Sequence, residues 1–186
     1  MKIQIELIQR CIGNDREAQK DLYNLLLPYL AAVCKRYLIN LSDINDVLQD
    51  TFIQIFKNIH SFDASKGNFK TWSTRIAINC SIKVNHKVKR VPITEFINDY
   101  HDKTIEPEIL HDLSAEDILI FLKEMPIEYF EVFNLNLIDG FSHKEISLKL
   151  KISESLSRKR LSRARKWIAG NVDRLNAIKN SFMILV

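Results

Sequence analysis

Apolar residues recur every three or four positions along most of the chain, which is the spacing of one face of an α-helix. In the first half, this pattern predicts a short helix and then a long one at about 15–38. It predicts a second long helix after a cap at Ser42 or Asp43, and a third over about 69–90. Ser, Asp, Gly and Asn at 61–70 indicate a loop. The first half is therefore predicted to be a helical bundle.

The helical pattern weakens at about 91–113, a segment that contains two prolines and is predicted to be a linker. It restarts after Ser114, which is a candidate helix cap. Pro126 is expected in the first turn of the following helix, and Gly140 is expected to end it.

The next two helices have the spacing of a helix-turn-helix. Ser142 and Glu145 match a capping box for a short helix, Lys151 and Ile152 form a turn, and Ser153 can cap a longer basic helix. A short helix, a tight turn and a second helix rich in arginine is a layout typical of DNA-binding proteins.

Composition supports an all-α fold with two small helical domains. The chain has 186 residues, 46% of them hydrophobic, and only four glycines and four prolines. We expect a first domain at 1–90, a flexible acidic linker at 91–113, a helix-turn-helix domain at 114–170 and a C-terminal tail at 171–186.

The net charge of +4 is modest, but it is unevenly distributed. Residues 95–117 carry eight acidic side chains against a single lysine, Lys103. Basic residues gather on either side of this acidic segment, at Lys83, Lys87, Lys89 and Arg90 and at Arg158, Lys159, Arg160, Arg163, Arg165 and Lys166.

Several classes of site and location are disfavoured. The three cysteines are far apart and lack metal-ligand spacing, and the five histidines are scattered, so we assign no catalytic residue, metal or cofactor. No apolar run is long enough to span or enter a membrane, and the N-terminus does not resemble a signal peptide. A cytoplasmic protein with reduced thiols and no membrane insertion is expected.

The basic helix needs one face for packing and one for a partner. Leu156 or Ser157, with Leu161, Ala164 and Ile168, are expected to face the core. DNA would relieve the repulsion among the outer charges, although a solvated helix or a surface for RNA or lipid is the alternative. The outer residues, predicted to contact DNA, are Ser155, Arg158, Lys159, Ser162, Arg163 and Lys166.

Three stretches in a fixed order identify a family. They are "DINDVLQDTFIQIFKNI", "FKTWSTRIAINCSI" and "MPIEYFEVFNLNLIDGFSHKEISLKLKISESLSRKRLSRARK". Together they resemble a bacterial RNA polymerase sigma factor of the sigma-70 family, of the small extracytoplasmic-function (ECF) type, over about 7–168. The resemblance implies a region 2-like domain that binds core RNA polymerase and opens the minus-ten promoter element. It also implies a region 4-like domain that reads the minus-thirty-five element.

The resemblance assigns polymerase binding to Asp46, Gln49, Asp50 and Phe52. The polar members of this set lie three and four residues apart, so they share one face of a helix and suit a polar contact between helices. Without the surrounding motifs, an ordinary solvated face would explain them equally well.

The minus-ten DNA is assigned to the loop and to the helix that follows it. Aromatic rings can stack on exposed bases, amides can read base edges and cations can hold phosphates. Trp72 has an equally good alternative role in the core. The predicted residues are Ser65, Lys66, Asn68, Phe69, Lys70, Trp72, Arg75, Asn79 and Lys83.

Two positions depart from the family pattern. Lys151 stands where glycine is usual, which puts the turn geometry in question, and Ser157 stands where a small branched apolar residue is common. The tail beyond about residue 170 extends past the resemblance.

The predicted function is a sigma factor that binds core RNA polymerase and promoter DNA and has no chemistry of its own. The resemblance also implies control by an anti-sigma factor. The alternative is a stand-alone helix-turn-helix regulator that binds DNA without polymerase. A DNA-processing enzyme lacks support, because no nucleophile-base pair or carboxylate cluster stands out.

Overall fold

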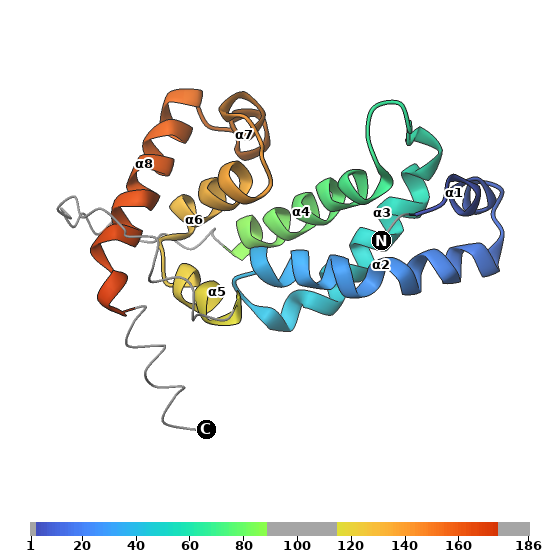
Figure 1. The fold of residues 1–186 in the computed structure, drawn as a ribbon, viewed down its shortest axis with the longest axis horizontal. Helices are drawn as coiled ribbons and strands as arrows, with labels where there is room; N and C mark the ends of the chain where they lie inside the picture. Colours follow the sequence, from blue (N-terminus) through green and yellow to red (C-terminus); the bar gives the residue numbers. More distant parts are fainter. Residues whose placement is uncertain (1–2, 89–114, 175–186) are drawn as a thin grey trace, which may run out of the picture. The chain divides into compact units, whose positions relative to one another are not determined.

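The computed structural model describes residues 3–88 and 115–174 of the chain. It divides into two compact units, Met1–Thr94 and Glu95–Val186 (Figure 1). All the regular secondary structure in the described ranges is helical, which confirms the predicted all-α fold. The predicted linker, the predicted cap Ser114 and residues 175–186 of the predicted tail lie outside the described residues.

The described part of the first unit contains four helices, and two short 3₁₀ turns flank the third of them. The long helices α2, α3 and α4 pack against one another, and α1 packs against α2 (Figure 1). Their bounds confirm the predicted helices to within a few residues. The elements are α1 (Ile5–Ile12), α2 (Arg16–Tyr37), η1 (Leu41–Asp43), α3 (Ile44–Asn58), η2 (Ile59–Ser61) and α4 (Phe69–Val88).

The core of the first unit follows the apolar stripe of α2. Leu22, Leu26 and Leu30 recur every four residues and have no exposed surface. Asn85 of α4 is also buried, but its amide is satisfied, because Nδ2 donates to the Tyr37 carbonyl over 2.9 Å. Its Oδ1 accepts from the Ile39 amide at 3.3 Å, so this one side chain ties the end of α2 to α4.

The predicted cap of α3 is wrong in detail. Asp43 precedes the helix but makes no capping bond with its side chain. The chain enters through the 3₁₀ turn η1, and Asn40 caps that turn by accepting from the Ser42 amide at 3.2 Å. The added turn moves the capping role three residues upstream.

Residues 115–174 of the second unit form four helices and a π-helical turn. Pro126 occupies the position just before α6 rather than its first turn, and Gly140, with φ +72°, follows the π-helical turn. The elements are α5 (Ala115–Lys123), α6 (Ile127–Phe133), η4 (Asn134–Ile138), α7 (His143–Leu150) and α8 (Glu154–Gly170).

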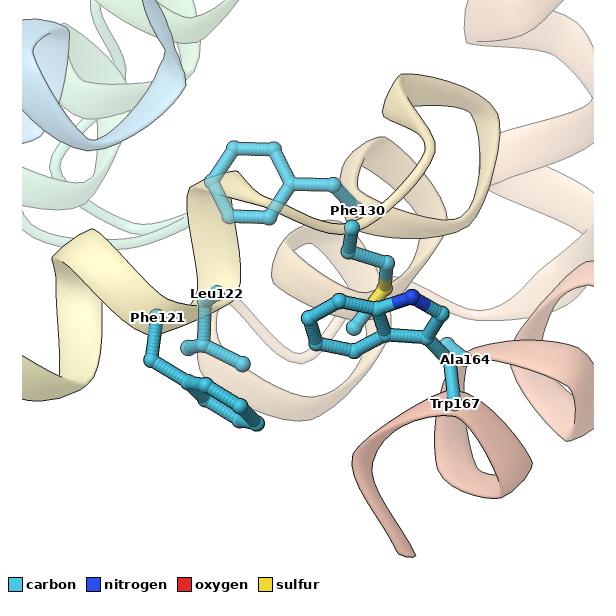
Figure 2. Packing of buried hydrophobic residues seen from close by; sticks show 6 residues of the cluster. Phe121, Leu122, Phe130, Ala164 and Trp167 are labelled. Atoms are coloured by element: carbon cyan, nitrogen blue, oxygen red, sulfur yellow. The ribbon is translucent and has the colours of Figure 1, made fainter. Parts of the chain in front are cut away.

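An aromatic cluster forms the core between α5, α6 and α8 (Figure 2). Trp167 is only 7% exposed, and its ring centroid lies 5.1 Å from that of Phe121. Trp167 was not among the predicted inner residues of the basic helix, whereas Ser157, Leu161 and Ala164 are buried as predicted. Position 167 lies at the edge of the predicted apolar stripe of α8, but the indole ring is large enough to reach the core from there.

The helix-turn-helix forms with the predicted local chemistry. Ser142 and Glu145 make both bonds of the capping box, and Ser153 Oγ accepts from the Leu156 amide at 3.0 Å. Lys151 adopts the left-handed conformation with φ 56°, so the turn keeps its shape without glycine. A non-glycine residue in that region carries a penalty of about 1 kcal/mol or more.

Candidate nucleic-acid and protein interfaces

The exposed face of α3 carries three of the four residues predicted to bind polymerase. Asp46, Gln49 and Asp50 are exposed, and their spacing places them on one side of the helix. Phe52 is only 5% exposed, and its ring centroid lies 4.3 Å from that of Tyr23 on α2. Phe52 therefore packs α3 against α2 and is not part of this face in the free chain.

The same face contains Ile53, which the sequence analysis missed. Ile53 is 52% exposed and follows Gln49 by four residues and Asp50 by three. This spacing could have indicated Ile53 from the sequence, because residues three and four positions apart share one face of a helix. The α3 face, defined here as Asp46, Gln49, Asp50 and Ile53, thus combines polar groups with an exposed apolar side chain, a composition suited to a contact with another helix.

The loop before α4 is ordered by its own polar side chains. Asp63 accepts from the Ser65 hydroxyl at 2.7 Å and from its amide at 2.9 Å, and it lies 3.3 Å from Lys66 Nζ. These bonds, with the Ser65 hydroxyl as the largest contributor, lower the pKa of Asp63. Ser65, Lys66 and Asn68 are all exposed, although Asn68 also accepts from the Thr71 amide at 2.7 Å.

Aromatic residues at the start of α4 pack against one another. Phe69 is 3% exposed, and its centroid lies 5.0 Å from that of Phe62 and 5.1 Å from that of Trp72. A base cannot stack on Phe69 while it is buried in this way, so its place is in the core. Trp72 is half-buried and therefore presents part of its ring to solvent.

Beyond Trp72, α4 presents a polar face. Arg75, Asn79 and Lys83 are exposed and recur every four residues, so they line one side of the helix. Lys70 lies elsewhere: it is half-buried, with its Nζ 3.9 Å from the centroid of the Tyr29 ring. The structure therefore brings together only part of the predicted minus-ten set.

All six predicted DNA-contacting residues of α8 are exposed, and the arginines Arg158 and Arg163 have partners within the unit. Arg158 forms an ion pair with Glu154 at 2.7 Å. Arg163 donates to the Tyr129 hydroxyl at 3.4 Å and stands 5.9 Å from the centroid of that ring. Exposed pairs of this kind contribute about 0–1 kcal/mol, so a phosphate or base can replace them at little cost.

A groove of about 500 Å³ runs along one side of α8 toward the start of α7. His143 and Arg165 line it and were not predicted as site residues. The sequence could have indicated Arg165, because its spacing from Arg158 and Ser162 places all three on one side of the helix. The full lining is His143, Arg158, Leu161, Ser162, Arg165, Lys166 and Ala169.

Metal and thiol chemistry find little support in the described ranges. No three His, Cys, Asp or Glu side chains within residues 3–88 and 115–174 group closely enough to hold a metal ion. Burial raises the pKa of the Cys34 thiol to about 11, so it is not a reactive thiolate at neutral pH. None of the helices in those ranges is long and apolar enough to cross a membrane.

Comparisons with known families match both units. Residues 22–89 match the family model of sigma-70 region 2, and residues 115–168 match that of sigma-70 region 4. The first range runs from within α2 through α3 and α4, and the second contains α5 to α7 and most of α8. The two matches therefore fall in the order and at the positions of the two units.

Individual relatives agree with these matches. The ECF RNA polymerase sigma factor SigW of Bacillus subtilis is 27% identical, over 86% of this chain and 91% of SigW. SigM of the same organism is 31% identical, over 65% of this chain and 74% of SigM. The fold also resembles that of the sigma factor RpoE from Bartonella quintana, solved with the anti-sigma factor NepR. That likeness has a TM-score of 0.51 and 23% identity, and it covers 87% of this chain and 96% of RpoE.

Proposed function

Because the chain belongs to the sigma-70 family, as a sigma factor of the ECF type, we propose that its exposed helix faces divide polymerase docking and promoter recognition between them. A sigma factor binds core RNA polymerase and directs it to promoters for DNA-templated transcription initiation. The observation that carries the proposal is the pairing of a region 2 match with one helical unit and a region 4 match with a folded helix-turn-helix unit.

Core polymerase is proposed to bind the α3 face. Asp46, Gln49 and Asp50 offer hydrogen-bond acceptors and charge, and Ile53 offers an apolar contact at the C-terminal end of this strip. Phe52 contributes by holding α3 against Tyr23. A mixed polar and apolar strip of this kind suits a helix of the partner, since helical contacts use anchors at positions i, i+3, i+4 and i+7.

The minus-ten element is proposed to meet the exposed side of α4 and the loop before it. Arg75 and Lys83 supply positive charge, Asn79 supplies an amide, and the half-buried Trp72 supplies a ring edge near the loop. Ser65, Lys66 and Asn68 are exposed in that loop. Phe69 is proposed to act indirectly, by supporting Trp72 through their 5.1 Å contact.

The minus-thirty-five element is proposed to meet the outer face of α8. Ser155, Lys159 and Ser162 are exposed there, beside the arginines whose surface partners are easily exchanged. Arginine recognises guanine through two hydrogen bonds in the major groove, and the remaining cations hold the backbone. Sigma factors generally perform no chemistry, and we propose the same of this chain, acting in the cytoplasm where polymerase and DNA meet.

An anti-sigma factor is proposed as the regulator of this chain. Support comes from the relative solved with one, RpoE with NepR.

Run-off transcription on genomic DNA tests the proposal. The purified chain is mixed with sigma-free core polymerase and host DNA, and the 5′ ends of the transcripts are sequenced. Discrete start sites that share two spaced upstream elements, absent with core polymerase alone, are the expected result. Specific duplex binding by the chain alone, with no new start sites, would favour the stand-alone regulator instead.

A further inference from the structure

The two helices of the helix-turn-helix are joined by a hydrogen bond between His143 and Ser157. His143 Nδ1 on α7 lies 2.8 Å from Ser157 Oγ on α8. Ser157 is fully buried, so its hydroxyl needs a partner, and the half-buried imidazole provides it. The bond occupies Nδ1 and fixes the ring relative to α8, which leaves Nε2 as the nitrogen that can bind something else.

The groove beside this histidine is strongly basic. Arg158, Arg165 and Lys166 line it with His143, and its lining contains no acidic side chain. Buried Leu161 and Ala169 contribute its apolar part. From position 158 to position 169, α8 rises about 16 Å at roughly 1.5 Å per residue. Successive phosphates of one DNA strand advance about 3.4 Å along the axis, so a groove of this length can contact more than one of them.

The chemistry of Nε2 agrees with an oxyanion ligand. When the Ser157 hydroxyl donates to Nδ1, the proton of the neutral ring is on Nε2. When the ring is an imidazolium, Nδ1–H donates to Ser157 and Nε2 again carries a proton. In both of these states Nε2–H can donate to a phosphate oxygen, whereas a neutral ring with its proton on Nδ1 would leave Nε2 as an acceptor, so the site requires one of the first two states.

We propose that this groove binds the phosphate backbone of duplex DNA, with His143 donating from Nε2 and Ser157 acting as its positioning residue. The inference deepens the proposed function and rests on it for the identity of the DNA, the minus-thirty-five element. DNA is favoured over other phosphates because Arg158, Ser162 and Lys166 belong both to the groove and to the proposed DNA face of α8. One ligand can then cover both surfaces.

Binding of the full chain to a labelled 30-base-pair duplex of arbitrary sequence, measured over a series of salt concentrations, tests the site. Phosphate contacts are independent of sequence, so a promoter is not required. We expect His143→Ala to weaken binding about five- to tenfold and Ser157→Ala to weaken it by a smaller factor. In the double variant, Ser157→Ala should add nothing, because it acts through His143.

Two further variants keep the test independent of folding. Arg165→Gln changes an exposed side chain, and we expect weaker binding with a salt slope about one unit shallower. His143→Arg should restore binding even with Ser157→Ala present, because the guanidinium supplies its own charge. His60→Ala replaces an exposed histidine of the first unit and serves as the matched control. Thermal unfolding of each variant identifies those that lose structure.

The outcomes separate this inference from the proposed function. Unchanged duplex binding by His143→Ala and Arg165→Gln overturns the groove, even if run-off transcription shows new start sites. Weakened binding by those variants, with no start sites, supports the groove as a DNA-binding site and counts against the proposed promoter recognition. If inorganic phosphate perturbs the His143 ring resonances and the duplex does not, the site binds free anions and the proposal is overturned.

Discussion

Asn134 is a fully buried polar residue of the second unit. Its side chain is fully buried in the π-helical turn η4, and neither Oδ1 nor Nδ2 has a hydrogen-bond partner among the described residues. A buried polar group without a partner destabilises the fold by about 1–3 kcal/mol. Leucine has the same branching at Cγ and no polar atom. We therefore expect Asn134→Leu to raise the free energy of unfolding of this unit by about 1–3 kcal/mol.

The larger volume of leucine does not reverse this expectation. Overpacking a filled core costs about 1–3 kcal/mol, while each buried carbon that replaces a polar atom contributes about 0.8 kcal/mol of hydrophobic stabilisation. These two effects are of similar size and opposite sign. The removal of the unpaired amide therefore decides the direction of the change.

The two tryptophans allow the second unit to be followed separately. Trp72 lies in the first unit, and Trp167 lies in the core of the second. In a Trp72→Phe background, the fluorescence of Trp167 reports urea unfolding of the second unit alone. With a urea dependence of about 1–3 kcal/mol per molar, the expected stabilisation raises the unfolding midpoint by about 1 M.

The neighbouring Asn136 provides a control with the opposite sign. Its Nδ2 donates to the Phe141 carbonyl at 2.8 Å, so Asn136→Leu should lower the free energy of unfolding by about 0.5–1.5 kcal/mol. The reasoning is refuted if both leucine variants lower the midpoint, because the Asn134 amide would then be stabilising the unit in its present environment.

Three further expectations concern polymerase, DNA and pH. Asp50→Ala and Ile53→Asp should each weaken holoenzyme assembly in a core-polymerase pull-down without changing duplex binding by the free chain. If both variants assemble normally, the α3 face does not bind polymerase. Arg163→Ala should reduce discrimination at one minus-thirty-five base pair by about 1–3 kcal/mol in competition binding; a loss equal for all sequences would mean a phosphate contact instead. The pKa of the Cys34 thiol is raised from its ordinary value of 9.0 to about 11 in the fold, so between these pH values the unfolded chain loses its thiol proton more readily than the folded chain. The urea midpoint of unfolding should therefore decrease as the pH rises from 9 to 11, and Cys34→Ala should make this decrease smaller.

The helix-turn-helix shows how well local chemistry can be predicted. The capping box at Ser142 and Glu145, the cap at Ser153 and the end of the helix before Gly140 depend on residues only a few positions apart. Bonds of that range depend mainly on the local sequence, so the sequence was sufficient to place them here. The order of the motifs was likewise enough to indicate the family, which the region 2 and region 4 matches confirm.

Burial of individual side chains was harder to predict. Phe52 and Phe69 belong to the motifs that indicated the family, yet both rings pack inside the first unit. Ile53, the residue directly after Phe52, is 52% exposed. A helical stripe gives the direction of a side chain only to within part of a turn, and the neighbouring helix decides which of two adjacent residues it covers.

The sequence by itself therefore determined the helices, the caps of the helix-turn-helix, the two-part organisation and the family, because these follow from spacing and short-range bonds. Tertiary structure alone decided that His143 meets Ser157 across fourteen positions, that Trp167 completes the aromatic core and that Asn134 is buried without a partner. Such contacts depend on how helices cross, and the crossing is set by the packing of many side chains at once.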